Sequence, residues 1–222
     1  MNSSSQKETT QLTIDVWADV LCPWCYVGEK RLELVIEQLP FADDINLRLH
    51  TFQLDPTATS KVAPTLDYLS RKYGVSVTEA RSMEEGMAQQ AAHEGLKYEV
   101  DRPQSSTFDM LRLVHLGSVY GVAWKYLRAM QTEVFSGNFD AFEHSTLIRI
   151  GEGLGIPTEE IRDVLTSNRY ADAVLADHNE AVKLGATGVP FTVIAHRVGI
   201  PGAVSTNQYR ENIEEVWGKL ND

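Results

Sequence analysis

The sequence is short of cysteine and of positive charge, and each shortage argues against a class of protein. Only two of the 222 residues are cysteine, while 43% are hydrophobic, so the chain can build an apolar core without disulfide staples. Lys and Arg number 20 against 31 Asp and Glu, which gives a formal net charge of −11. We therefore expect no nucleic-acid partner, because phosphate contacts require clustered Lys and Arg.

Long apolar runs are also missing. None approaches the roughly 20 residues that cross a bilayer, so we expect no membrane span. Residues 1–11, MNSSSQKETTQ, are polar and lack the apolar stretch of a secretory signal. We expect them to form a disordered tail and the protein to work in the cytoplasm, although a mature exported form with an added methionine would look the same.

The N-terminal part of the chain contains a strand–helix–strand pattern. Residues 12–19 alternate between apolar and other side chains, a period of two that predicts a strand. A helix is predicted next, because apolar residues recur at i, i+3, i+4 and i+7 until Pro40 ends the pattern. These apolar positions are Leu32, Val35, Ile36 and Leu39. Residues 45–50 alternate again, and if the two strands are parallel the segment is a βαβ unit.

The rest of the chain has a different pattern. Between residues 61 and 186 helical spacing dominates and no strand is expected. Strand character returns at residues 190–195, PFTVIA, with HRVGIPG as the expected hairpin partner and an amphipathic helix over residues 209–220. The two ends of the chain therefore look like halves of one sheet, with a helical block inserted between them.

The two cysteines, Cys22 and Cys25, form a CPWC motif with three possible explanations. A zinc site needs two more ligands, and the six histidines show no HxxxH-like spacing, so no metal is expected. A structural disulfide across so short a loop would remove little entropy from the unfolded chain. A redox pair fits the position best, because the motif lies between a strand and a helix of a βαβ pattern.

Redox chemistry needs these residues in this place. Cys22 would be the helix N-cap, where free N–H groups and the helix dipole favour the attacking thiolate, and Pro23 suits the first helical position. Cys25, one turn on and facing inward, would resolve the mixed disulfide. Trp24 would project at the surface and could offer an apolar contact to a substrate. Glu29, one turn beyond Cys25, fits a solvated helix glutamate better than a group that tunes Cys25.

CPWC near residue 22 and GVPFTV near residue 190 together resemble the DsbA-like thioredoxin-fold oxidoreductases, most closely the FrnE-like branch. The resemblance spans roughly residues 12–220. It implies an α/β thioredoxin-like fold over residues 12–60 and 187–222, with residues 61–186 as a large inserted helical domain. It also implies a cis Val189–Pro190 bond beside Cys22. Pro190 would then belong to the catalytic site with the cysteines, and Val189, Pro23 and Trp24 would contact the substrate.

The function we expect is thiol–disulfide exchange without a cofactor, on cysteine-containing proteins or small thiols and disulfides. Two alternatives stay open. Related folds include glutathione-dependent isomerases or transferases of the hydroxychromene-carboxylate isomerase and kappa type, which usually lack a full CxxC. The second alternative is a chaperone-like binding module whose redox activity is incidental. The sequence leaves the direction of electron flow, the recycling partner and the oligomeric state undetermined.

Overall fold

The fold is centred on a sheet formed by the two ends of the chain. The structure is a computed structural model that describes residues 11–221, so residues 1–10 of the expected tail lie outside the described residues. The four-stranded sheet has the order β2-β1-β5-β6. β1 and β2 are parallel, whereas β5 is antiparallel to both of its neighbours, so the predicted βαβ unit and hairpin are present. The strands are β1 (Leu12–Ala18), β2 (Ile45–Thr51), β5 (Phe191–Ile194) and β6 (Val198–Pro201).

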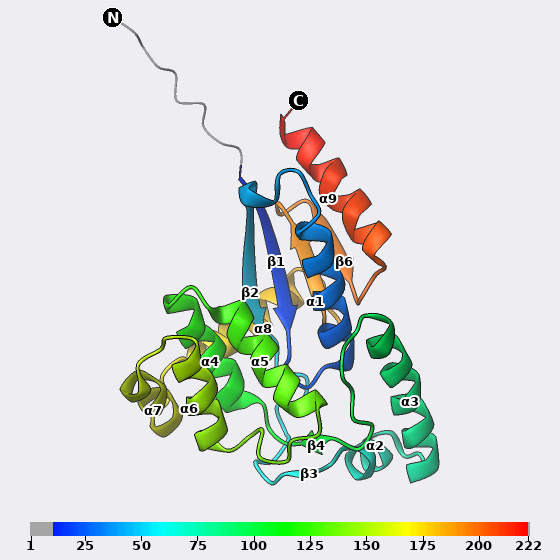
Figure 1. Cartoon of the computed structure of the whole chain (residues 1–222), viewed down its shortest axis with the longest axis vertical. Helices are drawn as coiled ribbons and strands as arrows, with labels where there is room; N and C mark the ends of the chain where they lie inside the picture. Colours follow the sequence, from blue (N-terminus) through cyan, green and yellow to red (C-terminus); the bar gives the residue numbers. More distant parts are fainter. Residues whose placement is uncertain (1–10, 222) are drawn as a thin grey trace, which may run out of the picture.

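The side chains of β1 point alternately to the two faces of the sheet, and helices cover both faces. Leu12, Ile14 and Val16 pack on one face in a cluster with residues of α1 and α9, and Figure 1 shows these two helices along the sheet. Trp17 lies on the opposite face, in a cluster with Phe191 and with α8. These helices are α1 (Pro23–Ile36), α8 (Ala171–Lys183) and α9 (Thr206–Asn221).

The segment between β2 and β5 is mainly helical, as expected. The expectation of no strand there is wrong at one place, because β3 (Ala63–Pro64) and β4 (Pro103–Gln104) form a two-stranded antiparallel pair. Strands of two residues are too short to show an alternating pattern, so periodicity could not predict them. None of the helices in residues 11–221 is long and apolar enough to cross a membrane. The helices not yet given are η1 (Ala42–Asp44, a 3-10 helix before β2), α2 (Thr65–Tyr73), α3 (Val77–His93), α4 (Phe108–Val119), α5 (Ala123–Phe135), α6 (His144–Gly153) and α7 (Thr158–Thr166).

One apolar cluster joins this helical segment to the end of β1. It contains both cysteines together with buried residues of α4 and α5, among them Met110, Leu111 and Met130. The CPWC motif is therefore held by the same core that stabilises the helical segment. The division into residues 12–60 with 187–222 and residues 61–186 stays a prediction.

Candidate active site

The predicted redox pair lies where the chain leaves β1 and enters α1. Cys22 is the N-cap of α1, with φ −76° and ψ 113°, and Pro23 is at the start of the helix. The Cys22 Sγ accepts a hydrogen bond from the backbone N–H of Cys25 at 3.3 Å. The sulfur thus takes the place of an N-capping oxygen, where unpaired N–H groups and the helix dipole favour a thiolate.

Cys25 has a different environment one turn along the helix. Its side chain is completely buried, and neither cysteine is in a disulfide in this structure. Burial raises the pKa of the Cys25 thiol well above its usual value, and the hydrogen bond to Cys22 and the charge of Glu29 raise it further. Cys25 is therefore held as a neutral thiol beside a sulfur that caps a helix.

The turn before β5 brings Pro190 and Val189 to the cysteines. The Val189–Pro190 peptide bond is cis. The Cys22 thiol donates a hydrogen bond to the carbonyl oxygen of Val189 at 3.3 Å, although 167 positions separate the two residues. Pro190 itself accepts a hydrogen bond from the N–H of Gly202 at 2.8 Å, next to the β5–β6 pair. The backbone of this turn is thus within reach of a group bound to Cys22.

Gly28 is a site residue that sequence reasoning missed. It lies on the face of α1 that meets the Pro190 turn, and a Cβ there would be 2.9 Å from the Ala203 Cβ and 3.3 Å from the Pro190 Cγ. A side chain at position 28 would push these segments apart. Gly28 therefore lets α1 and the Pro190 turn pack closely, and no local pattern could have indicated it because both neighbours are far away in the sequence.

Glu29 is buried, so its interpretation as a solvated glutamate is wrong. The Arg128 guanidinium and the Gln131 amide, both on α5, donate hydrogen bonds to its carboxylate, each at 3.2 Å. Burial raises the pKa of Glu29 to about 7, against the opposing effect of Arg128. The prediction failed because α5 covers this side of α1 with partners that lie 99 and 102 positions away.

The comparison with known families agrees with this geometry. Residues 13–214 match the family described as DSBA-like thioredoxin domain. The chain belongs to this DsbA-like family. The predicted fold class, an α/β thioredoxin-like fold of the DsbA type, is confirmed, whereas the FrnE-like branch stays a prediction.

Individual known proteins are also similar to this DsbA-like chain. The crystal structure of a probable DsbA oxidoreductase from Streptomyces coelicolor is similar, with a TM-score of 0.84 and 36% identity over 94% of this chain and 91% of the other. The uncharacterized protein YwbO of Bacillus subtilis is 24% identical over 93% of this chain and 98% of its own length. A 2-hydroxychromene-2-carboxylate isomerase shares the fold at 15% identity, with a TM-score of 0.64 and coverage of 94% and 95%.

The predicted substrate contacts of this DsbA-like protein surround the cysteines. Pro23 and Trp24 line a cavity beside the start of α1, and Trp24 is 45% exposed. Val189 lies at the other side of Cys22, where its carbonyl accepts the thiol hydrogen bond. Of the other five predicted site residues, Cys25 and Val189 hydrogen-bond to the Cys22 sulfur, and the roles of all six stay a prediction.

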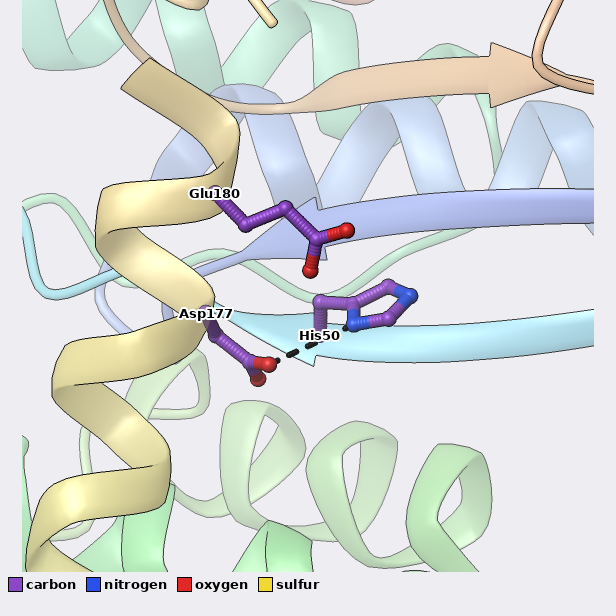
Figure 2. A group of neighbouring side chains, drawn as sticks. All are labelled: His50, Asp177 and Glu180. Atoms are coloured by element: carbon purple, nitrogen blue, oxygen red, sulfur yellow. Dashed lines mark hydrogen bonds and ion pairs between the residues drawn. The ribbon is translucent and has the colours of Figure 1, made fainter. Parts of the chain in front are cut away.

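A separate group of side chains, His50, Asp177 and Glu180, has the composition of a metal site (Figure 2). The imidazole is already engaged, with Nε2 at 2.8 Å from Asp15 and Nδ1 at 3.4 Å from Asp177. Burial disfavours its charged form, but the hydrogen bonds to Asp15 and Asp177 outweigh this and raise the pKa of His50 to about 9. Both ring nitrogens of His50 are therefore occupied by carboxylates, and His50 forms an ion-pair network with Asp15 and Asp177.

Proposed function

We propose that the protein is a thiol–disulfide oxidoreductase in which Cys22 attacks and Cys25 resolves. The observation that carries the proposal is the position of one sulfur atom. The Cys22 Sγ lies 3.3 Å both from the backbone nitrogen of Cys25, whose N–H donates to it at the α1 N-terminus, and from the carbonyl oxygen of Val189. The contact with the N–H favours a thiolate, and the Val189 carbonyl belongs to backbone that a substrate can pair with.

In the proposed reaction the reduced protein transfers two electrons to a disulfide. The Cys22 thiolate attacks one substrate sulfur, forms a mixed disulfide and expels the other sulfur as a thiolate. Cys25 then loses its proton and attacks the Cys22 sulfur, which releases the second substrate thiol and leaves a Cys22–Cys25 disulfide. The reverse sequence oxidises a dithiol. The substrates would be cysteine-containing proteins or small disulfides, and the cytoplasmic location expected from the sequence stays part of the proposal.

The glutathione-dependent isomerase or transferase is the second candidate. A shared fold with a hydroxychromene-carboxylate isomerase favours it, although 15% identity carries no more than the fold. A complete cysteine pair argues for dithiol exchange, since glutathione chemistry of that kind has no use for a buried resolving thiol such as Cys25.

Substitution of each cysteine by serine separates the two candidates. We expect Cys22→Ser to reduce disulfide exchange to the uncatalysed rate, because no attacking sulfur remains. We expect Cys25→Ser to accumulate a stable mixed disulfide on Cys22, because nothing resolves it. Non-reducing mass spectrometry after incubation with excess cystamine measures both. Ordinary exchange activity in the two variants would exclude the dithiol mechanism.

A further inference from the structure

Three side chains with metal-ligating atoms meet between β2 and α8. His50 comes from β2, whereas Asp177 and Glu180 lie three positions apart on α8 and so share one face of that helix. One ligand atom of each residue lies within 4.8 Å of the corresponding atoms of the other two. Figure 2 shows the two acidic side chains reaching from α8 towards the His50 ring. Imidazole nitrogen and carboxylate oxygen are both ligands that Zn²⁺ accepts.

The spacing of two of these atoms fits a shared zinc ion. His50 Nδ1 and Asp177 Oδ1 are 3.4 Å apart. This separation is near the limit of an N–H···O hydrogen bond, whose usual length is about 2.7–3.2 Å. Two ligands of a tetrahedral Zn²⁺, each bound at about 2.1 Å, are themselves about 3.4 Å apart. The two atoms therefore already have the separation that a zinc ion between them requires.

The other ring nitrogen of His50 is held by a carboxylate. Nε2 lies 2.8 Å from Asp15 Oδ1, and Asp15 is buried and also bound by Arg48. The ring is stacked on Trp17, with 4.4 Å between the centroids. A histidine that ligates a metal usually donates its second N–H to a carboxylate or a carbonyl, which fixes the ring and its tautomer. Asp15 thus orients the ring so that Nδ1 faces α8.

One oxygen of Asp177 is held in a similar way. Oδ2 accepts hydrogen bonds from the N–H of Thr51 at 2.7 Å and from its hydroxyl at 3.0 Å, and His115 Nε2 lies 3.2 Å from it. These contacts fix the carboxylate and leave Oδ1 directed at the His50 ring. Two of the three ligands are therefore oriented before an ion binds, which lowers the entropic cost of binding it.

The charges of the cluster also favour a divalent cation. Asp15, Asp177 and Glu180 bring three carboxylates, against two cations, Arg48 and the protonated His50. With the second histidine taken as neutral, one negative charge is in excess. Zn²⁺ in place of the proton on His50 adds one positive charge, so the cluster would become neutral.

We propose that His50, Asp177 and Glu180 bind one Zn²⁺ ion, with water in the fourth position. The ion binds to Nδ1 of His50 and releases the proton of that nitrogen to solvent, so the ion-pair network described above is the form of the site without metal. A bound ion would join α8 of the helical segment to β2 of the sheet. The proposal does not depend on thiol–disulfide exchange at the CPWC motif.

The test is Zn²⁺ binding by the full-length Cys22→Ser/Cys25→Ser variant, because the thiols of the CPWC motif are zinc ligands themselves. Competition with a chromophoric chelator gives the affinity and the number of ions per chain. Co²⁺ is the spectroscopic probe, and in this variant it should show visible d–d bands without a thiolate charge-transfer band. We expect one ion per chain and a thermal unfolding temperature that rises with the Zn²⁺ concentration.

Two further substitutions in this variant locate the ion. Glu180→Gln and His50→Gln each remove one ligand, and we expect each to weaken Zn²⁺ binding about tenfold or more, since even the loss of a supporting group costs this much. Glu180 is exposed, so its substitution leaves no buried group without a partner. Asp172→Asn is the matched control for the acid, because Asp172 is also exposed on α8 but lies outside the cluster. His93→Gln, at the exposed end of α3, is the control for the histidine.

Each other result overturns the proposal. If zinc binds to wild type but not to the Cys22→Ser/Cys25→Ser variant, its ligands are the cysteines. If Glu180→Gln binds zinc as tightly as Asp172→Asn, the ion lies elsewhere on the protein. Equal losses in His50→Gln and His93→Gln would show that binding follows the number of histidines and not this site.

Discussion

At the residue scale, the two cysteines have the same side chain but different surroundings. The Cys22 sulfur caps a helix and touches the Val189 carbonyl, whereas Cys25 is buried beneath it, near the carboxylate of Glu29. The first environment could be predicted, because a cap followed by proline is a local pattern. The second could not, because the groups that hold Glu29 come from α5.

Glu29 makes the stability of the fold depend on pH. Its pKa is raised from 4.5 to about 7, so the folded protein holds this proton more tightly than the unfolded chain. The resulting stabilisation is complete below pH 4.5 and is lost as the pH rises through 7. We expect wild type to lose about 3 kcal/mol relative to Glu29→Gln across this range. Denaturant unfolding of both proteins at several pH values measures the difference.

Glu37→Gln is the control for this measurement, because Glu37 lies at the exposed end of the same helix. Its unfolding free energy should stay parallel to that of wild type at every pH. If the Glu29→Gln curve is also parallel, Glu29 does not hold a proton in the folded state.

At the element scale, α1 connects the parts of the site. Its N-terminus holds Cys22, one face contacts the Pro190 turn at Gly28, and another face binds α5 through Glu29. Periodicity could predict α1 and the strands around it. It could not predict the left-handed backbone of the turn between β5 and β6, where Ala195 and His196 adopt φ of 47° and 54° without a glycine.

The close approach at Gly28 predicts the effect of adding one methyl group. Gly28→Ala should displace the Pro190 turn, destabilise the fold by about 1–3 kcal/mol and slow disulfide exchange, because the Ala203 Cβ would be only 2.9 Å away. Unfolding free energy and the exchange rate with a small disulfide measure the two effects. Gly86→Ala on α3 is the control, because no atom lies within 4 Å of the added Cβ. That variant should gain roughly 0.5–1 kcal/mol, as alanine favours the helix, without any change in exchange.

At the scale of the whole molecule, the helical segment and the sheet are joined by one apolar cluster and one polar network. The apolar cluster that contains the cysteines connects β1 to α4 and α5. A polar network connects β1 and β2 to α8 and α4: Asp177 accepts a hydrogen bond from the N–H of Thr51 at 2.7 Å, and His115 lies 3.2 Å from the same carboxylate. The order of the four sheet strands and of the helical segment between them could be predicted, but these connections could not, because no pattern within one element specifies its distant partners.

The polar network predicts a loss of stability in mild alkali. His50 stacks on Trp17 and lies between the carboxylates of Asp15 and Asp177, with Arg48 also bound to Asp15. Its pKa is raised from 6.5 to about 9, so its contribution is complete below pH 6.5 and is lost as the pH rises through 9. We expect wild type to lose on the order of 2 kcal/mol relative to His50→Gln across this range, less than the full shift implies because solvent screens the partly exposed ring, and denaturant unfolding measures the loss. His93→Gln, at the exposed end of α3, should leave the curve parallel to wild type. If His50→Gln does the same, His50 does not hold an extra proton between β2 and α8 in the folded protein.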